Sequence, residues 1–114
     1  MQTEINKRIN IERAIHFIDS NCIMPLSLDQ VARKSGMSKF YFARSFKSLT
    51  GRTFKNYQNY KRIEKAKNLL REDEVRVIDI CFSIGFNDVS YFNRVFKKIA
   101  GLSPSCFKKQ LSRN

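Results

Sequence analysis

The residues of this chain with the clearest chemical potential are basic and amide side chains on one side of a predicted helix. Residues 88–100 contain an apolar stripe at helical spacing, expected to be buried, which consists of Phe92, Val95, Phe96 and Ile99. Off this stripe lie Asn93, Arg94, Lys97 and Lys98. Guanidinium and amide groups can each form two hydrogen bonds to a base edge, and ammonium groups attract phosphate. The predicted chemistry is recognition of a nucleic acid rather than catalysis.

A helix, a glycine turn and a second helix are expected to position these side chains. Gly85 can adopt the positive φ that ends the first helix without steric cost. Asn87 and Asp88 follow, and both residue types cap the start of a helix. Gly101 ends the second helix, and Ser103-Pro104 begins another short one. This helix-turn-helix pattern with an exposed basic face is typical of DNA-binding proteins.

The same pattern occurs twice in the chain. Gly36 matches Gly85 at an offset of 49 residues, as Val31 matches Ile80, and the offset becomes 50 after one extra residue. Seven residues then match in register: Tyr41, Phe42, Arg44, Phe46, Lys47, Gly51 and Tyr57 with Tyr91, Phe92, Arg94, Phe96, Lys97, Gly101 and Phe107. Repeats of this length usually represent one supersecondary unit used more than once. The sequence therefore predicts two helix-turn-helix units.

Composition favours an anionic partner. The chain has 114 residues and a net charge of +12, although a ribosomal or membrane-surface protein would show a similar charge. Three cysteines without a CxxC motif, and a single histidine, argue against a disulfide framework and a zinc site. No cofactor is expected. The sequence contains no paired carboxylates, Ser-His-Asp set or phosphate-binding loop, so it does not predict an enzyme. No apolar run approaches the ~20 residues of a membrane span, and no signal peptide is recognisable, so a cytoplasmic location is expected.

The remaining signals predict an all-α fold. Apolar periodicity predicts a helix over about residues 10–21, after a frayed polar start. Ser27 and Gln30 form a capping box for a helix that ends at Gly36, and Ser38 caps the next helix over about residues 39–50. The aromatic residues expected in the core are Phe42, Phe46, Phe86, Phe92, Phe96 and Phe107.

Residues 54–71 are predicted to form a long helix between the two units. At ~1.5 Å per residue, 18 residues span about 27 Å, comparable with the ~34 Å turn of B-DNA. A stiff helix could hold recognition helices at about 38–50 and 88–100 near successive major grooves. Because no linker-like segment appears, residues 1–114 are predicted to form a single domain that packs as one body. Its parts are the first unit at 10–52, the linker helix at 54–71 and the second unit at 77–111.

The motif GFND-SYF-R-FKK-AG-SPS at residues 85–105 resembles the signature of the AraC/XylS family of bacterial transcription regulators. The resemblance covers about residues 10–111. It implies a seven-helix domain with two helix-turn-helix units joined by a long helix, acting on double-stranded promoter DNA at the bacterial nucleoid, with RNA polymerase as a second partner by analogy. Cys81 stands where the family usually has alanine, and Phe107-Lys108 where Tyr-Arg is common. Larger members carry a sensor, dimerisation or receiver domain before this one, so the chain is either a small stand-alone member or an excised C-terminal part.

Base readout requires side chains opposite the buried stripe of each recognition helix. In the first unit these are Lys39, Phe40, Ala43, Arg44 and Lys47, and in the second Val89, Ser90, Asn93, Arg94 and Lys97. Arg44 suits a guanine edge, and Asn93 suits adenine. Phe40 and Ala43 offer apolar surface to thymine methyl groups. The alternative for each arginine is a phosphate contact or an ion pair with an acidic side chain.

Phosphate contacts are predicted near helix starts, where backbone N–H groups are free to bind anions. The candidates are Ser38, Arg52, Thr53, Lys55, Lys98, Ser103 and Lys108. Each exposed lysine could instead serve only solubility. The alternative function is a non-specific DNA-binding or protein-interaction module, which would bind unrelated DNA with equal strength.

Overall fold

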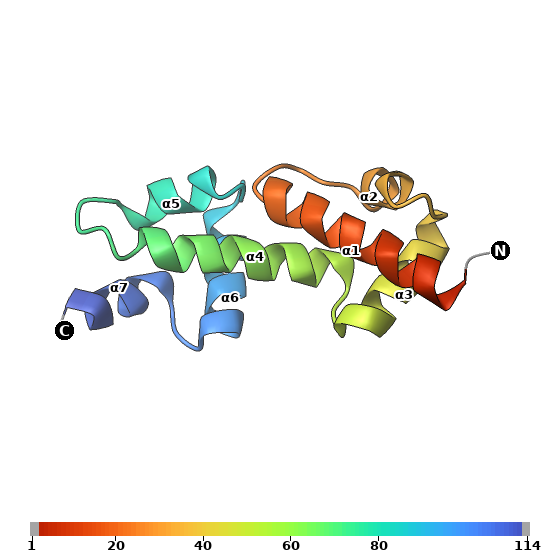
Figure 1. Cartoon of the computed structure of the whole chain (residues 1–114). Helices are drawn as coiled ribbons and strands as arrows, with labels where there is room; N and C mark the ends of the chain where they lie inside the picture. Colours follow the sequence, from red (N-terminus) through yellow and green to blue (C-terminus); the bar gives the residue numbers. More distant parts are fainter. Residues whose placement is uncertain (1–2, 113–114) are drawn as a thin grey trace. The chain divides into compact units, whose positions relative to one another are not determined.

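The computed structural model describes residues 3–112, which form seven α-helices and no strand (Figure 1). The helices are α1 (Glu4–Asn21), α2 (Leu28–Lys34), α3 (Lys39–Thr50), α4 (Phe54–Leu69), α5 (Val77–Ser83), α6 (Val89–Ala100) and α7 (Pro104–Ser112). The predicted all-α class is confirmed. Helices α2 and α3 form one helix-turn-helix pair, α5 and α6 form the other, and the long helix α4 joins them in the chain.

Two compact units divide the chain, Met1–Gln58 and Asn59–Asn114, and their boundary falls inside α4. Each unit has its own buried core. The first unit contains α1, α2, α3 and the start of α4, and the second contains the rest of α4 with α5, α6 and α7. Packing of the whole chain as one body stays a prediction.

Aromatic rings from α3 and α4 fill the core of the first unit. Phe42 and Phe46 are fully buried with ring centroids 5.5 Å apart, and the ring of Phe54 lies 6.4 Å from that of Phe42. Helix α1 adds one apolar face to this core, consisting of Ile11, Ala14 and Ile18. The start of α4 is also held by a polar contact, because the Tyr57 hydroxyl donates to Asp19 Oδ1 at 2.9 Å.

The core of the second unit follows the same plan. Phe92 and Phe96 are fully buried with ring centroids 5.9 Å apart, and the ring of Phe86 lies 5.4 Å from that of Phe92. The second half of α4 supplies the apolar face, with Ile63 and Ala66 and, just beyond its end, Leu70. These three residues repeat the spacing of Ile11, Ala14 and Ile18 at an offset of 52. The repeat therefore covers three helices, with α4 in the second unit equivalent to α1 in the first.

Cys81 lies in the second core as a small apolar group. Its side chain is fully buried on α5. Burial raises the pKa of the thiol, and the nearby Asp88 carboxylate raises it further. The thiol therefore stays protonated at neutral pH and can occupy an apolar site.

The two glycine turns share one hydrogen-bond pattern. Gly36 has a φ of 71° and Gly85 a φ of 101°. In both turns the N–H of the next residue donates to the carbonyl five residues back, at 3.0 Å for Met37 and 3.1 Å for Phe86. This Schellman arrangement ends the helix sharply and directs the following apolar side chain inward. Met37 and Phe86 are accordingly buried.

The ends of α3 and α6 lie where capping signals predict them. Ser38 Oγ and Asp88 Oδ1 each accept the N–H three residues later, at 3.4 Å and 3.2 Å. Both helices end at a left-handed glycine, Gly51 with a φ of 79° and Gly101 with a φ of 87°. Both recognition helices are thereby fixed at 12 residues.

Two other helix ends differ from the prediction. Helix α1 begins at Glu4 rather than near residue 10, and Thr3 Oγ1 caps it by accepting the N–H three residues later at 3.1 Å. The frayed start predicted for residues 1–9 is therefore wrong from Glu4 onward. The additional turns expose Ile5 and Ile9, so a search for a buried stripe could not detect them. Helix α4 ends at Leu69 rather than at residue 71.

The predicted aromatic core is largely confirmed. Five of its phenylalanines are buried: Phe42, Phe46, Phe86, Phe92 and Phe96. Phe107 is only half-buried and packs at the edge of the second core, with its ring centroid 5.5 Å from that of Phe96. Cys22 and Cys81 are buried, whereas Cys106 is exposed on α7.

Candidate nucleic-acid interface

The outer face of α3 is cationic with one large apolar side chain. Lys39, Phe40, Arg44 and Lys47 are exposed, and Ala43 is half-buried. The Phe40 side chain is 74% exposed, more than any other large apolar side chain of residues 3–112. Lys39 Nζ lies 4.0 Å from Asp29 Oδ2, but both groups are exposed. Such a surface pair contributes at most about 1 kcal/mol and does not prevent the lysine from meeting a phosphate.

The outer face of α6 has the same cations and a more polar surface. Ser90, Asn93, Arg94 and Lys97 are exposed. The Arg94 guanidinium lies 5.8 Å from the centroid of the Tyr91 ring, a cation–π arrangement that directs it along the helix. Val89 is half-buried against the core of the second unit, which leaves little of its surface for a base.

Three predicted phosphate contacts cap helices. The hydroxyl oxygens of Ser38, Thr53 and Ser103 accept the N–H three residues later, at 3.4, 3.2 and 3.2 Å. The other first-turn N–H groups of α3, α4 and α7 have no carbonyl partner within their own helix. These helix starts are therefore suited to an anion. The exposed cations near helix ends are Arg52, Lys55 and Lys98.

Lys108 has a structural position that argues against its predicted phosphate contact. It is half-buried, and Nζ donates to the carbonyl of Glu72 at 2.7 Å and to that of Leu70 at 3.4 Å. The ammonium group thus ties α7 to the loop that follows α4. That loop contains the exposed acidic residues Glu72, Asp73 and Glu74.

Buried polar side chains of α4 position α6, and the sequence analysis missed them. Asn59 Nδ2 donates to the Tyr91 hydroxyl at 3.0 Å, and the Arg62 guanidinium lies 5.2 Å from the Phe86 ring centroid. Asn59 is only 5% exposed and Arg62 only 6%. Asn59 lies four residues before Ile63, and Arg62 lies four residues before Ala66, so both residues share the face of α4 that carries its apolar stripe. Their position on that stripe was the available signal.

Gln58 has a comparable role in the first unit. Its side chain is fully buried, and Nε2 donates to the backbone carbonyls of Cys22 at 3.1 Å and Met24 at 2.8 Å. The amide therefore fixes the segment after α1 against the start of α4. Both carbonyls are distant in the sequence, and the sequence analysis did not identify this contact.

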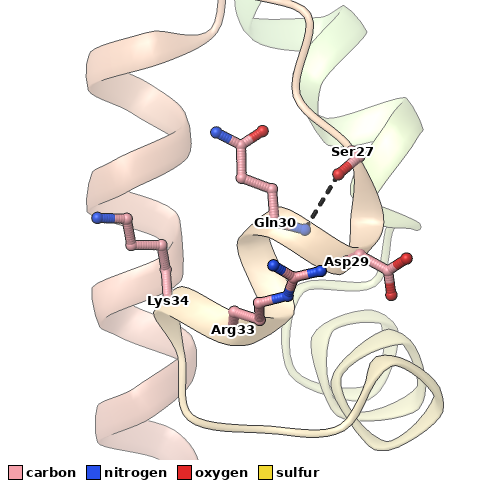
Figure 2. Close-up of a pocket in the computed structure, with 5 residues that line it drawn as sticks. All are labelled: Ser27, Asp29, Gln30, Arg33 and Lys34. Carbon is pink, nitrogen blue, oxygen red and sulfur yellow. Dashed lines mark hydrogen bonds between the residues drawn. The ribbon is translucent and has the colours of Figure 1, made fainter.

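A hollow of about 330 Å³ lies on the outer side of α2 (Figure 2). Its lining consists of Ser27, Asp29, Gln30, Arg33 and Lys34. The Ser27 hydroxyl accepts the Gln30 N–H at 3.0 Å, which confirms the predicted cap of α2. The lining contains both signs of charge and none of the predicted DNA-contacting residues, so it adds nothing to the interface.

Comparison with known proteins identifies the family. A helix-turn-helix domain model matches residues 31–110. The regulatory protein SoxS of Salmonella typhimurium is 35% identical over 101 residues, which cover 89% of this chain and 94% of SoxS. The chain belongs to the AraC/XylS family. Proteins of this family are transcription regulators that bind DNA sequence-specifically, and this chain has both helix-turn-helix units of the family domain.

Solved structures have the same fold as this member of the AraC/XylS family. The C-terminal domain of AraT, a response regulator from Geobacillus stearothermophilus, is 29% identical with a TM-score of 0.82, and the match covers 89% of this chain and 84% of that one. The DNA-binding domain of AdpA, solved in complex with a target DNA, is 21% identical with a TM-score of 0.81, covering 88% and 90%. At 21% identity, the likeness to AdpA shows only that the two proteins share a fold.

Other classes of site find no support among residues 3–112. In that part of the chain no group of three or more His, Cys, Asp or Glu side chains could hold a metal ion. No helix there is long and apolar enough to cross a membrane. The AraC/XylS domain is a DNA-binding domain of transcription regulators, a class that is generally not enzymatic.

Proposed function

We propose that this protein reads duplex promoter DNA at two places, with α3 and α6 in successive major grooves. The observation that carries the proposal is the equivalence of these helices. Each has 12 residues, buries two phenylalanines on one side and exposes an arginine and a lysine at matching positions on the other. At ~1.5 Å per residue, the 16 residues of α4 extend about 24 Å, a length of the same order as one ~34 Å turn of B-DNA.

The proposed base contacts differ between the units. Arg44 and Arg94 would each bind a guanine edge through two hydrogen bonds, and Asn93 would bind adenine in the same way. Phe40 and Ala43 would contact thymine methyl groups. The remaining members of the proposed base-contacting set are Lys39, Lys47, Val89, Ser90 and Lys97, of which Val89 has the least exposed surface.

The proposed phosphate contacts hold the protein in register on the duplex. The N-terminal turns begun by Ser38, Thr53 and Ser103 would present backbone N–H groups to phosphate oxygens. The exposed cations of the proposed phosphate-contacting set are Arg52, Lys55 and Lys98. Lys108 is left out of this set because two backbone carbonyls already bind its ammonium group.

Selection of bound duplexes from a random-sequence pool, near 150 mM salt, tests the proposal. We expect two short enriched blocks about one helical turn apart. Arg44→Ala and Arg94→Ala should each relax a different block and weaken binding by about 1–3 kcal/mol. Arg71→Ala is a suitable control, because this exposed arginine hydrogen-bonds Asn68 at 3.0 Å and is outside the proposed contacts. It should change neither block.

Two other outcomes would contradict the proposal. A single enriched block would mean that only one unit reads bases, while the other contacts phosphate. No enriched sequence would favour the alternative, a non-specific DNA-binding module held by charge. Competition by unrelated DNA at equal strength would support the same alternative.

Analogy with the family suggests RNA polymerase as a second partner and the bacterial nucleoid as the place of action. Both follow only if the chain binds promoters. A pull-down of purified RNA polymerase on promoter DNA, with and without this protein, would test the first point.

A further inference from the structure

A hollow of about 530 Å³ lies on the first unit, between the beginning of α2, the middle of α3 and the beginning of α4. All of its lining residues belong to the first unit. Its volume is within the ~300–1,000 Å³ typical of small-molecule sites. It is distinct from the hollow on α2 shown in Figure 2, because the two share no lining residue.

The floor of this hollow is apolar and belongs to the packed core. Leu26 and Phe54 are 8% and 6% exposed, so their side chains are held firmly. Leu28 and Ala43 are half-buried and complete the floor from α2 and α3. Such a surface favours the apolar body of a ligand by removing it from water.

The rim is cationic. Arg44 and Lys47 of α3 and Lys55 of α4 are exposed there, and no acidic side chain lines the hollow. Thr53 also lines it, as the residue that caps the 16-residue helix α4. The N–H groups of Phe54 and Lys55 belong to the first turn of α4, where the helix dipole is positive and no intrahelical carbonyl is available. The rim therefore favours an anion, and the floor beside it favours an apolar group.

We propose that this hollow binds a small amphipathic carboxylate, and that the bound ligand competes with DNA for α3. The carboxylate would lie at the rim among Arg44, Lys47 and Lys55, and its apolar chain would cover the floor. The competition rests on the proposed function, because Arg44 and Lys47 are also proposed base contacts. Binding of the carboxylate alone does not depend on that function.

The repeat provides a matched negative control in the same molecule. At the positions equivalent to Ala43, Phe54 and Lys55, the second unit has Asn93, Pro104 and Ser105. Part of the apolar floor and one of the three rim cations are therefore replaced. Arg94 and Lys97 remain, so the second unit has two of the three cations with a more polar floor. A ligand that only sought positive charge would bind the second unit as well, through Arg94 and Lys97.

The test is a titration of the whole chain with decanoate, without DNA, followed by the shifts of its backbone amide NMR signals. We expect saturable shifts confined to residues 26–28, 43–47 and 53–55. Lys47→Ala should weaken decanoate binding about tenfold, the effect of losing one hydrogen bond to a charged group. The equivalent Lys97→Ala should leave it unchanged. Ala43→Leu should weaken binding by filling the hollow while keeping every cation.

Decan-1-ol, which has the same chain and no charge, should bind at least about tenfold more weakly, for the same lost charged hydrogen bond. Shifts that do not saturate, equal shifts in both units or equal binding of decan-1-ol would each overturn the proposal. A second measurement, duplex binding in the presence of decanoate, should show a lower apparent affinity. Saturable decanoate binding without that decrease would overturn the competition. DNA binding without sequence preference would overturn the proposed function and leave the carboxylate site standing.

Discussion

The two units have the same backbone frame and differ in the side chains that meet a partner. Their second helices both have 7 residues, their recognition helices both have 12, and both turns contain a glycine with positive φ. On the exposed faces, Ala43 is replaced by Asn93 and Phe40 by Ser90. Side chains at a glycine turn or an aromatic core are constrained by geometry and packing, whereas exposed ones are not. One scaffold can therefore present two different reading surfaces.

The units also differ in how polar groups hold them together. In the second unit Asn59 binds the Tyr91 hydroxyl, so α4 directly anchors the first turn of α6. The equivalent Tyr41 hydroxyl has no hydrogen bond to any of residues 3–112. The first unit relies on Tyr57 and Gln58 at the start of α4 instead. The recognition helix is thus anchored more directly in the second unit.

The largest expected effect tests whether each unit depends on its own core. Phe42→Ala and Phe92→Ala should each lower the free energy of unfolding by about 3–5 kcal/mol, because both rings are fully buried. Hydrogen exchange should then rise mainly in the unit that carries the change. Phe40→Ala, on the exposed side of the same helix as Phe42, should alter stability by less than about 0.5 kcal/mol. An equal rise of exchange in both units would show that the chain unfolds as one cooperative body.

The next largest effect tests whether the recognition helices of the two units are anchored differently. Tyr91→Phe removes the acceptor of the buried Asn59 amide and should cost about 1–2 kcal/mol of stability in urea unfolding. Tyr41→Phe, at the equivalent position, should cost less than about 0.5 kcal/mol. Equal costs for the two substitutions would contradict the contrast between the units.

How far the sequence predicts this molecule depends on whether a local signal exists. The ends of α3 and α6 were predictable because a capping side chain and a glycine mark each of them. The first turns of α1 were missed because Ile5 and Ile9 face solvent and give no buried stripe. The contacts of Gln58 and Lys108 were missed because their carbonyl partners lie more than 30 residues away in the sequence. The predicted reading faces are exposed except at Ala43 and Val89, which are half-buried. Which bases these faces contact stays a prediction.

Smaller effects on stability are expected at the N-caps of α3 and α6. Ser38→Ala and Asp88→Ala should each cost about 1 kcal/mol in thermal unfolding, because each removes an N-cap acceptor. Asp88→Asn should keep the cap and also strengthen DNA binding, since it removes a negative charge at the start of a helix proposed to approach phosphates. Weaker DNA binding by the stable Asp88→Asn variant would argue that α6 does not enter the groove by its N-terminal end.

The smallest effect concerns single lysines. Lys98→Ala should weaken binding to all duplexes alike and reduce the slope of log K against log salt by about 1. Lys108→Ala should leave that slope unchanged and instead lower stability by about 0.5–1.5 kcal/mol, because its ammonium group binds backbone carbonyls. A reduced slope for Lys108→Ala would restore it to the phosphate contacts.

The division of α4 between two cores has a consequence for the order of folding. The first core is complete at Gln58, so its contacts can form before the second half of the chain leaves the ribosome. Domains generally fold as units, with the N-terminal one first during synthesis. Packing of Phe54 and Tyr57 would then supply the costly first turn of α4, and a helix elongates in about a nanosecond per residue once nucleated. The second unit would start folding on a helix already begun by the first.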